Sequence, residues 1–167
     1  MNSLSAFFAR LPWHWYAIAF VVIVLDQWTK FAISSSFSYN ERLEIAPFFN
    51  LTLRHNYGVA FSLFDNIGGG QRWPLSALAL IVSTVLLVWI FRKGKQFSFE
   101  TLGLALVLGG AIGNLYDRVS LGYVVDFVEW HYGGYYWPAF NIADSAISIG
   151  AVCLLIDLVF FSKPRSE

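Results

Sequence analysis

Residues 74–91 read PLSALALIVSTVLLVWIF, eighteen consecutive positions without a charged side chain. An α-helix needs roughly 20 residues to cross the hydrocarbon core of a bilayer, and this stretch is close to that length. Two basic residues, Arg92 and Lys93, follow it directly. The stretch therefore predicts a membrane-spanning helix and places the chain among integral membrane proteins.

The composition of the whole chain agrees with that class. Of its 167 residues 57% are hydrophobic and 13% are charged, and the mean hydropathy is +0.56. The seven Trp and eight Tyr suit a protein with two membrane interfaces, where such side chains gather. A net charge of zero offers no electrostatic basis for binding nucleic acid. Cys153, the single cysteine, lies in an apolar run, where we expect it to pack against its neighbours.

Three further apolar segments bring the number of expected membrane helices to four. The four segments lie at about residues 13–31, 74–91, 101–119 and 142–161. The first is a poor cleavable signal peptide, because only one basic residue, Arg10, precedes it and it runs into DQWTK at residues 26–30. Polar residues interrupt the first and third segments, which is typical of functional positions within a membrane.

Basic residues predict the orientation of these helices. Six of the eleven Lys and Arg fall on one side of the four segments: Arg10, Arg92, Lys93, Lys95, Lys163 and Arg165. The side richer in basic residues faces the cytoplasm as a rule. We therefore expect both termini in the cytoplasm and the two longer connections outside it.

A small extracytoplasmic β-sheet is expected in these two connections. In the stretch at about residues 37–70, apolar residues such as Leu43 and Leu51 alternate with polar ones, which is the period of a strand. Residues 123–130 are rich in β-branched and aromatic side chains, so a further strand is expected there. Residues 59–64 predict a short helix lying on the membrane surface, and glycines 68–70 a hinge.

Two aspartates lie where the outer boundary of the membrane is expected. Asp126 stands in VVDFV at residues 124–128, and Asp144 stands in FNIADS at residues 140–145. Two carboxylates close together cannot both ionise easily, so one keeps its proton while the other activates water. This is the chemistry of an aspartyl hydrolase, which requires neither a metal ion nor a cofactor.

Asp144 also has a purely structural interpretation. Asn141 and Asp144 have the spacing of a capping box, in which both residues complete the N-terminus of a helix. The two interpretations are compatible, because a helix N-terminus stabilises negative charge. On that basis we expect Asp144 to ionise more readily and Asp126 to hold the shared proton more often.

Other polar residues have both a structural and a functional interpretation. Asp26 and Lys30 have the spacing of an ion pair on one helix face, which could brace a loop on the outer side. Asn114 and Arg118 share a helix face, and both could direct donors toward the region of Asp126. Asn56 is either a turn residue or a donor to substrate.

The remaining motifs exclude or limit other classes. Gly109 and Gly113 form a small-xxx-small pattern, which predicts close helix packing. His14, His55 and His131 lack the spacing of metal ligands, and no Gly-x-Ser-x-Gly motif of a serine hydrolase is present.

Five motifs, in order along nearly the whole chain, closely resemble those of the bacterial lipoprotein signal peptidases, the signal peptidase II family. They are residues 26–30 (DQWTK), 56–61 (NYGVAF), 109–118 (GGAIGNLYDR), 124–127 (VVDF) and 140–145 (FNIADS). Tyr116 replaces what is often an aliphatic residue in the family. The resemblance implies a single peptidase domain over residues 1–167, with an outer β-cradle and a short surface helix.

The resemblance also implies an activity. Members of this family are intramembrane aspartic endopeptidases of the bacterial inner membrane, and they use no cofactor. They remove signal peptides from diacylglyceryl-modified prolipoproteins, cutting just before the lipidated cysteine near the periplasmic face. By motif position, Asp126 and Asp144 correspond to the catalytic pair of the family. Its other functional positions fall on Asp26, Lys30, Asn56, Asn114, Arg118 and Asn141.

Two other classes of membrane protein remain as alternatives at this point. A small proton-coupled transporter or channel subunit would use the same aspartates as a relay, with charges spread over the membrane depth and often an internal repeat. A non-catalytic assembly factor would not need two carboxylates in this setting.

Overall fold

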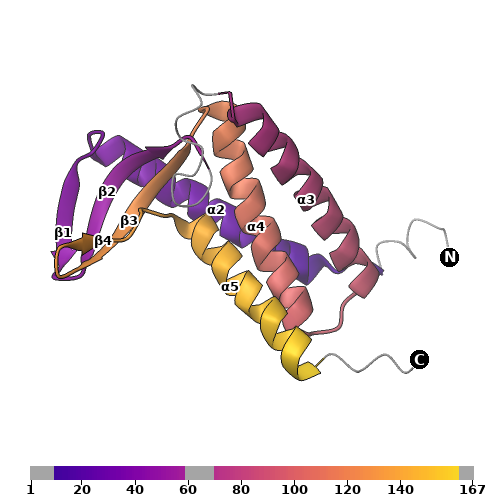
Figure 1. Cartoon of the computed structure of the whole chain (residues 1–167). Coiled ribbons are helices and arrows are strands. Elements are labelled where there is room, and N and C mark those ends of the chain that lie inside the picture. Colours follow the sequence, from indigo (N-terminus) through magenta and orange to yellow (C-terminus); the bar gives the residue numbers. More distant parts are fainter. Residues whose placement is uncertain (1–9, 59–69, 162–167) are drawn as a thin grey trace.

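Four long helices form a bundle, and a small sheet extends from one end of it (Figure 1). The structure is a computed structural model that describes residues 10–58 and 70–161. The helices are α2 (Trp13–Ser36), α3 (Arg72–Lys93), α4 (Phe99–Ser120) and α5 (Ile142–Ile156), which continues into the π-helical turn η2 (Asp157–Phe161). Each of the four is long and apolar enough to cross a membrane, as predicted.

The helix ends differ slightly from the predicted ones, with local reasons. α2 continues to Ser36 instead of ending near residue 31, and it stops where Phe37 turns to an extended backbone, with its N–H still donating to the carbonyl oxygen of Ile33 at 3.0 Å. α3 ends at Gly94, whose φ of 74° is open to glycine without strain. α4 starts with a capping box between Ser98 and Thr101.

α4 is the central helix of the bundle. Figure 1 shows it between α3 and α5, with α2 crossing behind, and it packs against all three. The buried apolar core joins α2, α3 and α4 through Trp15, Ala19, Leu86, Ile90, Leu104, Ala105 and Leu108. Large apolar side chains on the outer faces stay exposed, among them Phe20 at 64% and Ile81 at 61%. Such a surface suits helices that are surrounded by lipid.

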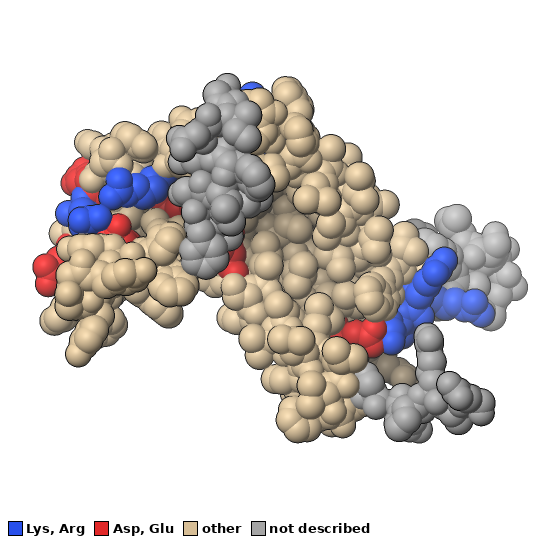
Figure 2. All heavy atoms as spheres, in the orientation of Figure 1, with Lys and Arg blue, Asp and Glu red and all other residues tan. Residues whose placement is uncertain are grey.

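Charged side chains are distributed as a membrane protein requires. On the face shown in Figure 2, most of them gather over the sheet or at the opposite end of the bundle, and the surface between is largely uncharged. At the end away from the sheet α2 and α4 begin and α3 and α5 finish (Figure 1). The charged groups therefore flank an apolar band, as expected for helices that span a bilayer.

Glycines on α4 allow its neighbours to approach closely, as the small-xxx-small pattern predicted. A Cβ atom at Gly109 would lie 2.7 Å from the carbonyl oxygen of Ala19 on α2. At Gly110 it would collide with the carbonyl oxygen of Ala143 on α5. At Gly113 it would lie 2.7 Å from the carboxylate of Asp26. The absence of side chains at these positions therefore sets the spacing of α2 and α5 against α4.

The sheet joins the two connections that were expected to lie on the same side of the membrane. Its four antiparallel strands follow the order β1 (Arg42–Ala46), β2 (Phe49–Asn56), β3 (Val124–Tyr132) and β4 (Tyr135–Tyr136). The first three agree with the predicted strands, and β4 was not predicted. It forms because Gly133 and Gly134, with φ of 56° and 83°, turn the chain back onto β3.

Two predicted features lie outside the described residues. They are the surface helix at residues 59–64 and all but the last glycine of the hinge at residues 68–70. The orientation of the termini stays a prediction.

Substituting Gly110 by Ala is expected to destabilise the bundle. The added methyl group meets the backbone of α5, and overpacking of this kind costs about 1–3 kcal/mol. The measurement is the thermal unfolding temperature of G110A in detergent. The control is A77V, which adds two methyl groups on an exposed position of α3. Equal unfolding temperatures for G110A and the wild type would contradict the packing role of this glycine.

Candidate active site

Asp126 is held on β3 by two side-chain amides. Its side chain is 2% exposed. Asn141 donates to its Oδ1 at 2.7 Å, and Asn56 donates to its Oδ2 at 3.0 Å. Burial, and after it the negative charge of Asp144, raises the pKa of Asp126 to about 7. Asp126 therefore keeps its proton at pH values where an ordinary carboxylic acid has lost it.

Asp144 lies in the first turn of α5, where the predicted capping box is present. The side chain of Asn141 accepts the backbone N–H of Asp144 at 2.9 Å, and the backbone N–H of Asn141 donates to Asp144 Oδ2 at 3.3 Å. Asn114 adds a bond from its amide nitrogen to Asp144 Oδ1 at 2.8 Å. Each carboxylate oxygen of Asp144 thus accepts one N–H, at the end of a helix that favours negative charge.

Asn141 connects the two aspartates. It is fully buried, and it contacts Asp126 through its side chain and Asp144 through both its side chain and its backbone. The preceding residue, Phe140, is paired with Val128 of β3, since each donates its N–H to the carbonyl oxygen of the other at 3.0 and 2.8 Å. This backbone pairing places the start of α5 beside the strand that carries Asp126.

Lys30 is the centre of a buried network behind the aspartates. Its Nζ lies 2.7 Å from Asp26 Oδ2 and 3.0 Å from Asp117 Oδ2. It also donates to Asn114 Oδ1 at 3.0 Å. The predicted pair of Asp26 and Lys30 is present, but it is not isolated. Lys30 also contacts Asp117 and Asn114, which both belong to α4. Since the oxygen of Asn114 faces Lys30, its amide nitrogen faces Asp144.

The ion pair braces a helix and not an outer loop, which corrects the expectation from the sequence. Asp26 Oδ1 accepts the backbone N–H of Ala143 at 2.9 Å, and this bond ties α2 to the first turn of α5. The reason is burial. Asp26 is 0% exposed and lies inside the bundle, where the free N–H groups of a helix start are the available donors.

Arg118 does not point a donor at the aspartates. Among the described residues it donates to the carbonyl oxygens of Gly58 at 3.0 Å and Asn114 at 3.5 Å. Its positive charge still acts electrostatically on Asp144 and Asp126. Arg118 therefore anchors the chain just beyond β2 and adds positive charge near the pair.

Asn56 is a turn residue, and its amide also contacts Asp126; the predicted contact with substrate stays a prediction. Its amide nitrogen donates to Asp126, and its side-chain oxygen accepts the backbone N–H of Gly58 at 3.0 Å. The second bond is that of an ordinary turn asparagine. The turn thus fixes the rotamer that presents the amide to Asp126.

Two residues of the site were missed from the sequence. Asp117 accepts the backbone N–H of Val125 at 3.1 Å, next to Asp126 in the chain, as well as the ammonium of Lys30. Gln27 donates to Asp117 at 2.8 Å and to Asp26 at 3.2 Å. One signal was available: an ammonium group has three donors, so a buried Lys30 needs more acceptors than Asp26 alone.

A cavity of about 520 Å³ opens beside Asp126 along the sheet. Among the residues that line it are Asn56 and Asp126, together with Arg54, Glu129 and Trp137 farther along. The cavity therefore reaches the otherwise buried Asp126, whereas Asp144 is not among its lining residues.

Comparison with known proteins shows one consistent likeness. The family model described as "Signal peptidase (SPase) II" matches residues 18–160. A lipoprotein signal peptidase of Teredinibacter turnerae is 56% identical over 149 residues, which are 89% of this chain and 89% of that protein. The lipoprotein signal peptidase of Cellvibrio japonicus is 51% identical over 146 residues, covering 87% and 86%.

Two solved structures, both described as a bacterial membrane enzyme, share the fold. The one at 2.3 Å resolution has a TM-score of 0.75 and 31% identity, covering 92% of this chain and 94% of its own. The one at 1.9 Å has a TM-score of 0.77 and 32% identity, covering 89% and 94%.

Replacing Lys30 by Met is expected to destabilise the protein strongly. The change leaves the carboxylates of Asp26 and Asp117 buried without their cation, and breaking a buried pair in this way costs about 3–5 kcal/mol. The measurement is thermal unfolding of K30M in detergent.

The matched control is K93M. Lys93 forms an ion pair with Glu100 but is 43% exposed, and such a pair contributes at most about 1 kcal/mol. If K30M and K93M lowered the unfolding temperature equally, the buried network would contribute no more to stability than a surface ion pair.

Proposed function

The chain belongs to the signal peptidase II family, and from this we propose that it is an intramembrane aspartic endopeptidase acting on diacylglyceryl-modified prolipoproteins. It is a multi-pass membrane protease of lipoprotein processing, like the relatives it matches. The finer proposal is that it cuts the bond just before the lipidated cysteine, with Asp126 and Asp144 as the catalytic pair. The observation that carries it is the link through Asn141, which bonds both carboxyl groups.

The two carboxyl groups are in different environments, and this difference assigns their roles. Asp144 accepts two N–H groups, from the side chain of Asn114 and the backbone of Asn141, and it lies at a helix N-terminus; each of these favours a negative charge. Asp126 has a pKa of about 7 and keeps its proton near neutral pH. We assign Asp144 as the general base and Asp126 as the general acid.

The reaction then proceeds in two steps. Asp144 takes a proton from a water molecule while the water oxygen attacks the scissile carbonyl carbon, and Asp126 gives its proton to the carbonyl oxygen. In the second step a proton passes from Asp144 to the leaving nitrogen, the C–N bond breaks, and Asp126 regains its proton from the gem-diol. The products are a new carboxyl terminus on the signal peptide and a free amine on the cysteine.

The other candidate residues act by holding this pair. Asn56 and Asn141 fix the carboxyl group of Asp126. Asn114 fixes that of Asp144, and Lys30 fixes the orientation of Asn114. We assign these four residues as positioning residues, with Asp26 behind Lys30 and with Arg118 holding the carbonyl oxygen of Gly58.

The proposed location follows from the substrate. A diacylated cysteine is confined to the bilayer, so its scissile bond lies near the membrane surface. Asp126 on the sheet and Asp144 at the start of α5 lie at the end of the bundle from which the sheet extends (Figure 1). We propose that this end faces the periplasm in the inner membrane, with both termini in the cytoplasm as the basic residues predict.

The comparisons do not support the alternative of a transporter or channel subunit. The matching family and the relatives named above are peptidases. The positions of Asp126 and Asp144 agree with this, because both belong to one end of the bundle and are not spread over the membrane depth as a relay requires.

Replacing either aspartate by asparagine is expected to abolish cleavage of a diacylated prolipoprotein in detergent. D126N and D144N each keep the shape but remove an acid or a base, which lowers the rate by about 10²–10⁴-fold. E44Q, the same chemical change at an exposed residue of β1, is expected to keep full activity. Near-normal turnover by D126N or D144N would rule out the catalytic pair.

The activity is also expected to fall as the pH rises through about 7, because Asp126 then loses its proton and both carboxyl groups are negative. The raised pKa means that the active form is the one below this value. The measurement is kcat/KM from about two units below to two units above this pKa. Thermal unfolding over the same range serves as the control. A constant kcat/KM over the whole range would contradict the assignment of Asp126 as the acid.

A further inference from the structure

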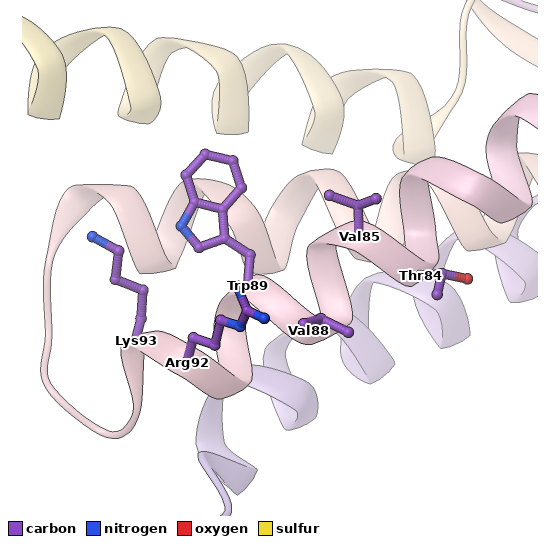
Figure 3. A pocket seen from close by; sticks show the side chains of 6 residues that line it. All are labelled: Thr84, Val85, Val88, Trp89, Arg92 and Lys93. Carbon is purple, nitrogen blue, oxygen red and sulfur yellow. The ribbon is translucent and has the colours of Figure 1, made fainter.

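α3 carries an open groove of about 520 Å³ along its second half (Figure 3), toward the end of the bundle away from the sheet (Figure 1). Two rows of residues line it: Thr84, Val88 and Arg92 form one, and Val85, Trp89 and Lys93 form the other. Residues four positions apart form a ridge on a helix, so the groove lies between two neighbouring ridges and runs along α3. It ends in the last turn of the helix, where Arg92 and Lys93 lie.

The groove changes from apolar to cationic along its length. Its apolar part offers no free polar group, because the hydroxyl of Thr84 donates to the carbonyl oxygen of Leu80 at 2.8 Å. Trp89 follows one turn before the end and is 44% exposed, as is typical of tryptophan at a membrane interface. Along the groove, apolar side chains are followed by an aromatic ring and then by two cations. This order matches the acyl chain, glycerol group and phosphate of a phospholipid.

The cationic end of the groove contains an arginine whose charge is not neutralised by an ion pair with any described residue. Lys93 is paired with Glu100, whereas Arg92 is exposed and has no ion-pair partner among residues 10–58 and 70–161. Arg92, Lys93 and Glu100 together carry one net positive charge, and a second carboxylate, that of Asp157, accepts the backbone N–H of Glu100 at 3.0 Å. A guanidinium group presents a planar pair of donors that fits a phosphate, and Lys93 keeps two further N–H donors for the same anion.

We propose that this groove binds an anionic phospholipid, with one acyl chain between the ridges of α3 and the phosphate on Arg92 and Lys93. Charge also argues against two other occupants. The start of a signal peptide is basic and would bring like charge to Arg92. A second copy packed on this face by a two-fold axis would bring its own Arg92 to the same place.

The test measures lipid binding to the purified full-length chain in detergent by native mass spectrometry. Phosphatidylglycerol is titrated in competition with phosphatidylcholine, which has the same acyl chains but no net charge. We expect phosphatidylglycerol to be retained more tightly, and R92Q to lose about fivefold in affinity for it. K95Q removes an equal charge from the connection that follows α3, outside the groove, and we expect it to bind as the wild type does.

A second variant separates the groove from the charge. V88W fills the space between the ridges at an exposed position and leaves every charge unchanged, so we expect it to lower phosphatidylglycerol binding as well. Three results would each overturn the proposal: equal retention of both lipids, equal losses in R92Q and K95Q, or unchanged binding in V88W. Because the readout is binding, none of them depends on the peptidase activity.

Discussion

One buried ammonium group organises the structure around the site. Lys30 comes from α2, and its three N–H donors reach Asp26 on the same helix and Asp117 and Asn114 on α4. Asp26 in turn holds the start of α5, and Asp117 holds β3 beside Asp126. A charge inside a membrane protein must find all its partners within the protein. Satisfying this one cation therefore brings together three helices and a strand.

Such a network requires the helices to lie unusually close. A Cβ atom at Gly113 would lie 2.7 Å from the carboxylate of Asp26, and at Gly110 it would meet the backbone of α5. Without side chains at these positions, the bonds of Lys30 and Asp26 reach across the helix interfaces. Packing and electrostatics thus depend on each other, because the glycines permit the approach and the ion pairs offset the cost of burying the charged groups.

The two aspartates are assigned different protonation states because the fold places them in different environments. Both accept amide N–H groups, but Asp144 stands half-buried at a helix N-terminus, whereas Asp126 is buried on a strand. Burial and the charge of Asp144 together raise the pKa of Asp126 to about 7. The same asparagine that caps α5 also bonds Asp126, so helix capping and the proposed acid–base chemistry use one residue. The polar groups of the proposed site gather at the end of the bundle that carries the sheet.

Much of this protein follows from its sequence alone, because the signals are local. Apolar length predicts the four spans, alternation predicts β1 to β3, and the spacing of Asn141 and Asp144 predicts the capping box. The short β4 and the end of α2 at Ser36 were not predicted, since β4 depends on a glycine turn and α2 continues past its apolar segment into polar residues. Only the tertiary structure decided that Lys30 reaches Asn114, which is 84 positions away, and that Arg118 binds the carbonyl oxygen of Gly58. Local patterns determine which residues form an element, but the partner of a buried charge is decided by which distant segments the packing brings together.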